Sequence, residues 1–556
     1  MSTERYDRQL RLWGPEGQRR VSECRVLAFG ATPSTCEALK NLILGGIKSF
    51  HLVDDALLAS PSRPDARARC LSELFEIVID AEMDSTSTVA EACVKGLARL
   101  NPDVGGTWTK SSARGSVNIA ESLTQSEGVD AVLVDGWWMG DEYVQELEAW
   151  ALKRGDVVLA TTRACGLFAE CKTSANARWV MENVTPEGSV TKDLRLMNPW
   201  SELQAYVEMK TSDLDRLDAA AFKHVPFVAL LASAAAQCGT SDRRAVKDAL
   251  TSMRRGLDEE NFDEAFANMR YAWTDTGAVT PEIEALTRDR RAIELTAESD
   301  KGWFLAAGLR EFISSEGCLP LEGSIPDMIS TTESYVELQR LYADKANRDA
   351  CVVWQSAVER AARVGYIGDL ITKQDAKTFC KHCRYVRFMT WRKMADELDP
   401  STSVTSGTAT LLKDAISDPS KTVSAFIFAA FRAASAFRGP GGRDPGVDPE
   451  TVIDSETGLP MSQDTFVSRD AEVLHEHMTR DVLQPRGVKL DQSTAKIAED
   501  VLYEYTRYGN GQLNAVGSVI GGIASQEIIK LVTRQYIPMT QRLIYDGVHS
   551  TTTLLF

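Results

Sequence analysis

Two short apolar segments near the start of the sequence, with a helical pattern between them, constrain the fold most. Residues 24–29 are mostly apolar and end in Gly30, and residues 50–53 are mostly apolar and end in Asp54. Apolar residues between the two segments recur at the spacing of one helix face: Cys36, Leu39, Ile43 and Leu44. A strand, turn, helix and strand, with an acidic residue about 24 positions after the glycine, are typical of the mononucleotide-binding half of a doubly wound α/β fold.

The alternation of strand and helix continues beyond this half. Residues 131–134 and 157–161 are two more apolar runs, and a helical stretch around residues 144–152 separates them. These runs predict an α/β domain with a parallel sheet, of the Rossmann-like kind.

The middle of the chain has a different pattern. Between residues 167 and 494 long helical periodicities replace strand-like runs, which predicts a mainly helical insertion. One helix is marked by a stripe of residues at helical spacing, preceded by the polar run 330–334: Tyr335, Leu338, Tyr342 and Ala346. The glycines and prolines of residues 438–449 predict a loop or hinge.

The α/β character returns near the C-terminus. Residues 515–532 read as a helix of small and apolar residues, and residues 542–545 and 551–556 read as two strands around the turn pair Asp546-Gly547. We therefore predict that residues 1–166 begin an α/β domain, 167–494 form the insertion and 495–556 complete the domain. We have no functional account of residues 56–101.

Composition narrows the classes of function. The chain has 556 residues and a net charge of -17, and such a chain repels phosphate backbones, so nucleic acid is a poor candidate partner. The charged N-terminus does not resemble a secretory signal, and the apolar stretches 225–236 and 426–437 are too short to span a membrane. The eleven cysteines have no regular spacing, which favours reduced thiols in the cytoplasm, the nucleus or both.

The loop after the first strand departs from a working nucleotide loop. Of the three fingerprint glycines only Gly30 remains, because Thr32 and Thr35 stand at the other two positions. Pro33 lacks a backbone N–H, which removes one donor from the nest that holds phosphate. A structural turn is the favoured interpretation and weak ATP or NAD binding the alternative; no Gly-Lys pair of a Walker-type loop occurs in the chain.

Other motifs carry little chemistry. The segment Cys380-Lys-His382-Cys383 lacks the second ligand pair of a structural zinc site, and the histidines His475 and His477 do not form an HExxH motif. There is no GxSxG elbow of a serine hydrolase. We predict no metal site, and core or surface thiols and solvated histidines are the simpler interpretation.

The opening segment Tyr6-Asp-Arg8-Gln9-Leu-Arg11-Leu-Trp13-Gly14 allows two interpretations. One is an amphipathic helix with solvated arginines and Trp13 packed on the sheet. The other is that Arg8 is presented to an anion, because a guanidinium matches phosphate geometry and stays charged.

These segments together resemble a known family. The opening segment, the first α/β half and the helix-turn-strand sequence of residues 515–547 resemble the adenylation fold of the activating enzymes for ubiquitin-like modifiers. The sequence of residues 319–329 and the positions that follow it resemble the regulatory subunits of the neddylation activating enzymes in particular: Tyr335, Leu338, Gln339, Tyr342, Lys345, Ala346, Asp349 and Ala350.

The resemblance implies a non-catalytic subunit. Active members of the family have a full glycine loop and an Asp-x-Asp start, whereas this chain keeps Gly30 and Asp54 but has Ala56 at the second aspartate position. The catalytic cysteine of the family is usually followed by threonine, and none of the eleven cysteines here is. The resemblance therefore implies a heterodimer whose catalytic subunit binds ATP, magnesium and the modifier and forms the thioester. A conjugating enzyme would join through the complex, and this chain itself would hold no cofactor.

The resemblance also implies roles for single residues. The arginine of the opening motif, here Arg8, acts in trans on the partner's ATP site, and Arg11 is structural. Candidates for the partner interface come from three places, the opening segment, the helix 345–358 and the C-terminal helix: Tyr6, Gln9, Trp13, Lys345, Asp349, Trp354, Gly517, Gly521 and Gly522. Packing inside the chain is the alternative for the tryptophan on the middle helix and for the three glycines.

Other functions stay open at this point. The chain could be the regulatory subunit of the sumoylation activating enzyme, an autonomous nucleotide-binding adenylating enzyme or oxidoreductase, or a free-standing adaptor that uses the fold for protein contacts only. Fold analogy does not decide among these functions, so we choose among them by the departures from a working nucleotide loop.

Overall fold

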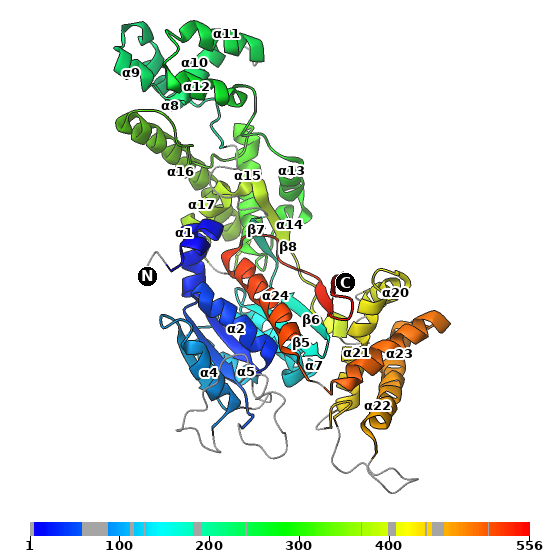
Figure 1. The fold of residues 1–556 in the computed structure, drawn as a ribbon. Helices are drawn as coiled ribbons and strands as arrows, with labels where there is room; N and C mark the ends of the chain where they lie inside the picture. The colour runs from blue at the N-terminus through cyan, green and yellow to red at the C-terminus, as the bar shows by residue number, and fades with distance from the viewer. Residues whose placement is uncertain are drawn as a thin grey trace. The chain divides into compact units, whose positions relative to one another are not determined.

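The computed structural model describes residues 5–57, 87–111, 116–126, 128–181, 192–238, 242–368, 370–398, 407–439, 442–447, 461–509 and 511–556. The chain forms two compact units. The first consists of Met1–Val180 and Met389–Phe556, and the second is the insertion Met181–Phe388. Each unit has its own core and is described by itself (Figure 1).

The first unit is built on an eight-stranded sheet, which confirms the predicted α/β class. Its strands stand in the order β10-β9-β6-β5-β4-β1-β2-β3. Their bounds are β1 Arg25–Phe29, β2 Ser49–Val53, β3 Gly105–Thr109, β4 Ala131–Asp135, β5 Val158–Cys165, β6 Phe168–Ser174, β9 Arg542–Asp546 and β10 Thr551–Leu555. Strands β1 to β5 are parallel, whereas β6, β9 and β10 run antiparallel to their neighbours.

The helices of the first unit are α1 Asp7–Glu23, α2 Pro33–Gly45, α4 Val89–Ala98, α5 Ser116–Ser126, α6 Gly136–Met139, α7 Asp141–Lys153, α18 Met394–Leu398, α20 Thr408–Ser417, α21 Thr422–Arg438, α22 Gln463–His477, α23 Gln492–Arg507 and α24 Asn514–Thr533. The predicted elements around residues 24–53, 131–161 and 515–545 are among them. The turn after β9 differs from the predicted tight pair, because Asp546 pairs with Thr551 and four residues lie between them.

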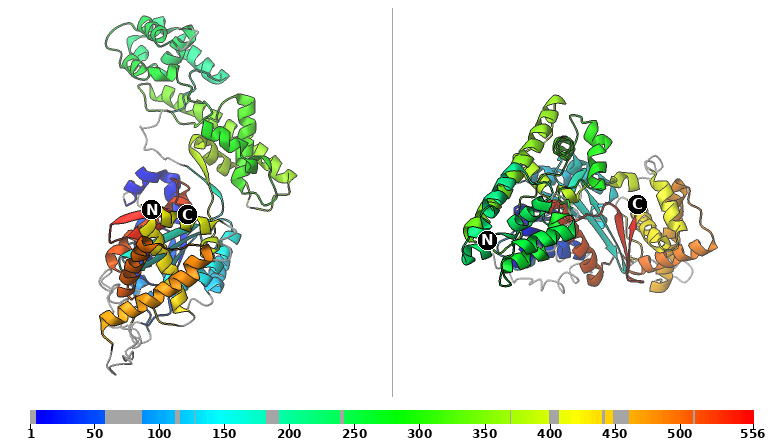
Figure 2. Two further views of the ribbon diagram at one scale, coloured as in Figure 1. Left: turned by 90° about the vertical axis from the view of Figure 1, so that its right-hand side faces the viewer. Right: turned by 90° about the horizontal axis from the view of Figure 1, so that it is seen from above.

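Alternating side chains place these helices on the two faces of the sheet. Val26 and Ala28 of β1 belong to one core with α2, α4 and α24, while Leu27 and Phe29 belong to another with α7. A third core joins α20 to α23 with the antiparallel strands, through residues such as Phe168. Helix α21 contacts strands β9 and β10 of the C-terminal hairpin, which is red in Figure 2.

Helix α24 is the one helix among the described residues that is long and apolar enough to cross a membrane, with a mean hydropathy of 1.4. Its composition has another cause here. Val516, Ile520, Ala524 and Ile528 recur four apart and are buried against the sheet and α2, so the helix is apolar because it is a core element.

The second unit is almost entirely helical, as predicted for the insertion. Its helices are α8 Ser201–Thr211, α9 Ala219–Lys223, α10 Phe227–Cys238, α11 Arg243–Met253, α12 Glu260–Ala267, α13 Pro281–Arg288, α14 Arg290–Ile293, α15 Lys301–Glu316, α16 Thr332–Arg363 and α17 Lys373–Lys381. Strands β7 Arg178–Met181 and β8 Val386–Met389 form a two-stranded sheet where the chain enters and leaves the insertion.

The predicted middle helix is α16. Thr331 caps its N-terminus by accepting a hydrogen bond from the Ser334 backbone, and Leu338 and Tyr342 of the predicted stripe are fully buried. The polar run and the apolar stripe therefore marked its start and its buried face correctly.

The boundaries of the insertion differ from the predicted ones. Residues 167–180 include strand β6, and residues 389–494 pack on the sheet of the first unit instead of joining the insertion. Helical periodicity shows which face of a helix is buried but not which core buries it, so the sequence could not separate α20–α23 from α8–α17. Of the predicted loop 438–449, Arg438 ends α21 and residues 442–447 are loop, while 440, 441, 448 and 449 lie outside the described residues.

Candidate functional site

The nucleotide-type loop lies at the carboxyl ends of β1, β2 and β4, where a doubly wound fold binds its ligand. Gly30 is in the left-handed region at φ +87°, and a Cβ there would lie 3.0 Å from the Cβ atoms of Asp135 and Trp138. This glycine is therefore required by the turn itself. The loop leads into α2 through Thr32, the N-cap, and Pro33, the first helical residue.

Phosphate binding in such a loop depends on free backbone N–H groups at the start of the helix. Here each of those N–H groups already has an acceptor in the chain. Two of the N–H groups donate to side chains from other parts of the chain: Ala31 to Asp54 Oδ2 at 2.7 Å and Ser34 to Gln512 Oε1 at 3.2 Å. The other three donate to acceptors within the loop: Thr32 to the Gly30 carbonyl at 3.0 Å, Thr35 to Thr32 Oγ1 at 3.4 Å and Cys36 to the Thr32 carbonyl at 2.9 Å. Pro33 has no N–H, so residues 31–36 keep no free backbone donor for a phosphate.

Gln512 fills the place in front of the helix. It lies immediately before Leu513, the N-cap residue of α24, and its side-chain amide both accepts from the Ser34 N–H and donates to Asp135 Oδ2 at 2.8 Å. Thr32 donates to the same Asp135 oxygen at 2.9 Å. We call Gln512, Asp135, Asp54 and Thr32 the filled cradle.

The filled cradle is also the wrong charge for a nucleotide phosphate. Asp135 is fully buried at the end of β4, and its other oxygen caps α6 by accepting from the Trp137 and Trp138 N–H groups at 2.9 and 2.8 Å. Asp54 is also fully buried, and its second oxygen accepts a hydrogen bond from the Ala56 N–H at 2.8 Å. The Asp135 carboxylate, fixed in front of the helix, would repel an anion brought into the loop. Asp54 does not weigh against a nucleotide, because an acidic residue at its position is usual in folds that bind nucleotides. The residues present also lack the free backbone donors with which such a loop holds a phosphate.

The glycines of α24 serve the packing of α24 on α2. A Cβ on Gly517 would lie 3.0 Å from Pro33 Cβ, and one on Gly521 would lie 2.5 Å from the Ser34 carbonyl oxygen. These two glycines let the helices approach closely within the chain, so any effect on a partner is indirect. Gly522 differs, because a Cβ there would meet nothing nearer than 3.9 Å and the residue is half-buried.

Helix α1 is two helices joined by a kink. Gly14 interrupts it at φ +71°, before Pro15, and leaves residues 7–13 as a separate two-turn helix that we call the N-terminal arm. Tyr6 and Trp13, at its two ends, are 3% and 6% exposed. Both were candidates for a partner contact, but both side chains are buried by this chain, so their role toward a partner is also indirect.

Arg8 is the free cation of the arm. It is exposed and makes no hydrogen bond or ion pair with the residues that the structure describes, whereas Arg11 pairs with Asp7 at 2.9 Å, as expected for a structural residue. Gln9 is half-buried, and its Oε1 atom is buried without a hydrogen-bond partner among the described residues.

The candidates on α16 belong to the second unit and are engaged within it. Lys345 pairs with Asp349 at 2.6 Å, and Asp349, 2% exposed, accepts from the Leu321 N–H at 3.0 Å. Trp354 is half-buried, donates to the Ile371 carbonyl at 2.9 Å and has Lys373 4.9 Å from its ring centroid. These contacts fasten α16 to its neighbouring loops; a contact with a partner through Lys345 or Trp354 stays a prediction.

Burial makes five of the described cysteines poor nucleophiles. Burial raises the pKa of the thiols of Cys24, Cys171, Cys318, Cys380 and Cys383, the last to about 12. No group of three or more possible metal ligands occurs among the described residues, which include Cys380, His382 and Cys383. Cys70 lies outside them.

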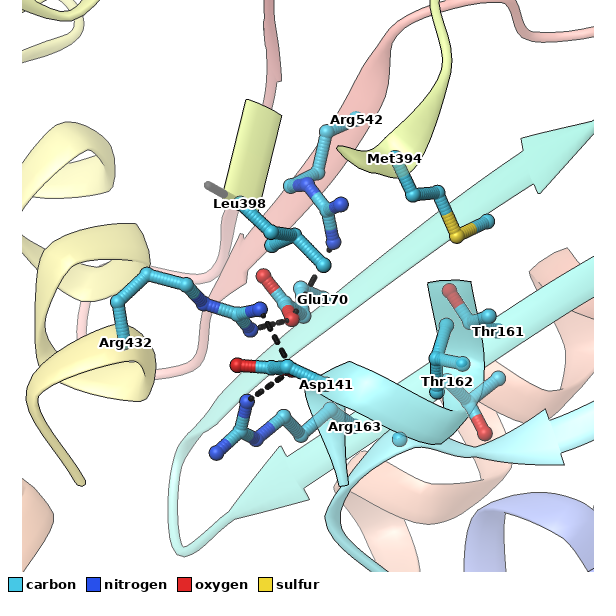
Figure 3. A pocket seen from close by; sticks show the side chains of 11 residues that line it. Asp141, Thr161, Thr162, Arg163, Glu170, Met394, Leu398, Arg432 and Arg542 are labelled. Atoms are coloured by element: carbon cyan, nitrogen blue, oxygen red, sulfur yellow. Dashed lines mark hydrogen bonds and ion pairs between the residues drawn. The ribbon is translucent and has the colours of Figure 1, made fainter. Parts of the chain in front are cut away.

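A small charged hollow lies beside β5 and β6 in the first unit (Figure 3). Arg432 of α21 points toward Asp141, 2.9 Å away, and toward Glu170, while Arg163 reaches Asp141 at 3.4 Å and Arg542 reaches Glu170 at 3.3 Å. Each arginine is thus paired with a carboxylate. These pairs bind α21 to the sheet, and the hollow is a structural charge cluster.

Sequence reasoning missed Gln512 and Asp135. The glutamine and Ser34 are 478 positions apart, and the glutamine stands in no motif, so no local signal could have paired them. A polar residue directly before a helix and an aspartate ending a buried strand are common, and only the folded chain brings them to one place.

Comparison with curated proteins finds relatives that span nearly the whole chain. The chain is 29% identical over 557 residues to the NEDD8-activating enzyme E1 regulatory subunit AXL of Arabidopsis thaliana, covering 98% of this chain and 97% of the relative. It is 28% identical over 573 residues to the regulatory subunit of Gallus gallus, covering 99% and 97%. The Saccharomyces cerevisiae subunit is 29% identical over 413 residues, 69% of this chain and 79% of that protein.

No family model matches the chain. Among solved structures, E. coli MccB matches 32% of this chain and 51% of its own at 13% identity, with a TM-score of 0.24. E. coli tRNA N6-threonylcarbamoyladenosine dehydratase, TcdA, matches 33% and 70% at 15% identity, with a TM-score of 0.22. The relationship rests on the curated relatives: the chain is a homologue, along nearly all of its residues, of the NEDD8-activating enzyme E1 regulatory subunits.

Proposed function

We propose that this chain is the non-catalytic subunit of a heterodimeric enzyme that activates a ubiquitin-like modifier of the NEDD8 type. The relatives support the pathway. One observation in the structure supports the non-catalytic role: each backbone N–H between Ala31 and Cys36 is bonded inside the chain, so the loop offers ATP no free backbone donor. ATP and magnesium then bind in the catalytic partner, which also carries the thioester cysteine.

The reaction explains why a second subunit is useful. The C-terminal carboxylate of the modifier attacks the α-phosphate of ATP, pyrophosphate leaves, and a thiolate of the partner then displaces AMP to form the thioester. Two anions meet in the first step, so a positive charge held at the phosphates lowers the barrier. Arg8 suits that role, because its guanidinium is exposed, is unpaired with the described residues and carries a permanent charge.

The partner surface that we propose is the outward side of three neighbouring helices of the first unit. Leu12 of α1, Leu44 of α2 and Val519 of α24 are 51%, 47% and 39% exposed, and Gly522 and Gln9 lie on the same helices. Such apolar side chains suit the charge-depleted core of a protein interface. The modifier and a conjugating enzyme join through the complex, which we place in the cytoplasm, the nucleus or both.

The test is ATP-dependent thioester formation by the purified heterodimer. We expect the isolated chain to bind no ATP in calorimetry and to form no adenylate. We expect Arg8→Ala to slow adenylation at least ~10²-fold without weakening the heterodimer, because it removes one charge from the reacting phosphates. Arg11→Ala is the matched control, since it removes a paired guanidinium from the same arm.

Three outcomes would contradict the proposal. If the isolated chain binds ATP or forms an adenylate, it is an autonomous enzyme. If the chain fails to associate with the catalytic subunit, it is not part of such a heterodimer. If Arg8→Ala and Arg11→Ala slow adenylation equally, the arm contributes no specific charge to the reaction.

A further inference from the structure

The N-terminal arm is too short to hold Arg8 in place on its own. An isolated helix of two turns is marginal in water, because the cost of nucleation is not recovered over so few residues. The position of Arg8 must therefore come from contacts that fix the arm to the body of the first unit. The structure shows such contacts at both ends of the arm, and the side chains of two amides, Asn101 and Gln535, and two tyrosines, Tyr6 and Tyr536, take part in them.

Asn101 fixes the beginning of the arm. It is 1% exposed and its Nδ2 donates to the Tyr6 hydroxyl at 2.8 Å and to the Ile43 carbonyl at 2.9 Å. Its Oδ1 accepts from Arg5 and from the Asp103 N–H. Both donors and both lone pairs of the amide are thus in use, and the two partners of Nδ2 belong to the arm's root and to the C-terminal turn of α2.

The Tyr6 ring adds a second constraint at the same end. Gly46 stands at φ +83°, and a Cβ there would lie 2.6 Å from the ring, so the ring lies directly against this backbone. Tyr6 also accepts the Leu10 N–H at its carbonyl, at 2.8 Å. Arg8 is two residues from Tyr6, so a shift of this ring also moves the backbone of Arg8.

Gln535 fixes the other end. Its Nε2 donates to the Trp13 carbonyl at 2.9 Å, and the neighbouring Tyr536 hydroxyl donates to the Leu12 carbonyl at 3.1 Å. The last carbonyls of a helix have no partners within it, so these two side chains cap the arm from the segment that follows α24. The Trp13 indole is held separately by Gln18, at 2.9 Å.

We propose that Asn101 and Gln535 are positioning residues for Arg8: two buried amides that clamp the arm at both ends and so fix where its one free guanidinium is presented. This proposal rests on the function proposed above, in which Arg8 acts on the partner's ATP. It assigns a catalytic consequence to residues that touch neither ATP nor the modifier.

The test combines conservative variants with Arg8→Ala in the purified heterodimer. Tyr6→Phe removes the acceptor of Asn101 but keeps the ring against Gly46, and Gln535→Met keeps the length of the side chain but removes the cap. Single-turnover adenylate formation then gives two numbers. Its amplitude counts folded complexes, and its rate reports the placement of Arg8.

We expect each variant to lower the rate roughly three- to ten-fold with an unchanged amplitude, which corresponds to the loss of one hydrogen bond that orients the group. In the Arg8→Ala background each should change the rate less than about two-fold, because the group being positioned is gone. A Gln492→Met variant, at an exposed glutamine on α23 outside the proposed partner surface, is the control for Gln535→Met.

The outcomes separate this proposal from the one on which it rests. If Arg8→Ala has no effect, the proposed function fails. If Arg8→Ala is slow but Tyr6→Phe and Gln535→Met are not, or if they are equally slow with and without Arg8, the positioning role is refuted. A loss of amplitude alone would mean that Asn101 and Gln535 serve only the folding of the arm, and would also refute it.

Discussion

Replacing Glu397 by glutamine should expose the energetic cost of the buried charges in the first unit. Glu397 is fully buried and accepts from Lys172 Nζ at 2.7 Å and from two nitrogens of Arg542 at 3.0 and 3.1 Å. Glutamine keeps the size of the side chain but removes the charge. Arg542 retains Glu170 at 3.3 Å, whereas Lys172, also fully buried, retains the neutral Thr540 carbonyl at 2.9 Å.

The magnitude follows from the lysine. Burial lowers the pKa of Lys172, and Glu397 opposes that change. Without Glu397 the folded protein loses the least free energy if Lys172 releases its proton. Relative to an ordinary lysine pKa of about 10.4, this costs about 1.36 kcal/mol per pH unit, or about 4 kcal/mol at pH 7.4. The value agrees with the roughly 3–5 kcal/mol lost when a buried pair loses one partner.

The same argument fixes the pH dependence. In the variant Lys172 is neutral when folded and protonated when unfolded, so unfolding binds a proton and the stability of the variant rises with pH relative to wild type. The deficit should therefore shrink by about 1.36 kcal/mol per unit, from about 4 kcal/mol at pH 7.4 to about 2 kcal/mol at pH 9.

The assay is guanidinium unfolding of the whole chain at both pH values, with hydrogen exchange of the β6 and β9 amides. The local readout is needed because a chain with two compact units need not unfold in one step. Glu499→Gln, on an exposed pair of α23, should cost less than about 0.5 kcal/mol. A deficit below about 1 kcal/mol for Glu397→Gln, or one that does not change with pH, would refute the reasoning.

Three further predictions follow from the same unit. Gln512→Ala should lower the free energy of unfolding by about 1–3 kcal/mol, because it leaves a helix N–H and a buried carboxylate short of a partner, yet calorimetry should show no gain of ATP binding. Gly521→Ala should cost about 1–3 kcal/mol in a thermal melt, since its Cβ would lie 2.5 Å from a carbonyl oxygen, while Gly522→Ala, with open space, should be neutral or slightly stabilising. Burial raises the pKa of Glu148, so wild-type stability should fall as pH rises above about 4.5, and Glu148→Gln should flatten that part of a melting-temperature profile.

The sequence predicted the α/β half well because its signals are local. Strands β1 and β2 are short apolar runs, α2 has an apolar face, and Gly30 stands at the turn that needs it. Strand β3, Gly105–Thr109, carried no such signal, since it is an edge strand with a mostly exposed surface. Edge strands are held by pairing with one neighbour, and nothing in their own composition requires a core.

The candidate site was predicted in part for the same reason. The loss of two glycines and the proline at the first turn of α2 predicted a loop unsuited to phosphate, and in the structure the remaining backbone N–H groups of the loop are bonded within the chain. The surroundings of the interface candidates were harder to predict: Tyr6, Trp13, Gly517 and Gly521. A sequence does not show whether an aromatic ring or a glycine faces a partner or its own chain. Their burial depends on residues such as Asn101 and Pro33, which local pattern cannot place beside them.

The filled cradle also indicates how a nucleotide fold can do without its nucleotide. A helix that begins behind a glycine loop leaves backbone donors at its N-terminus, and a buried donor without a partner costs about 1–3 kcal/mol. In a working site the phosphate satisfies such donors. Here Thr32, Asp54 and Gln512 satisfy them, so the loop stays folded without a ligand. Restoring the glycines alone should therefore not restore ATP binding, because the amide of Gln512 and the carboxylate of Asp135 would still occupy the place of the phosphates.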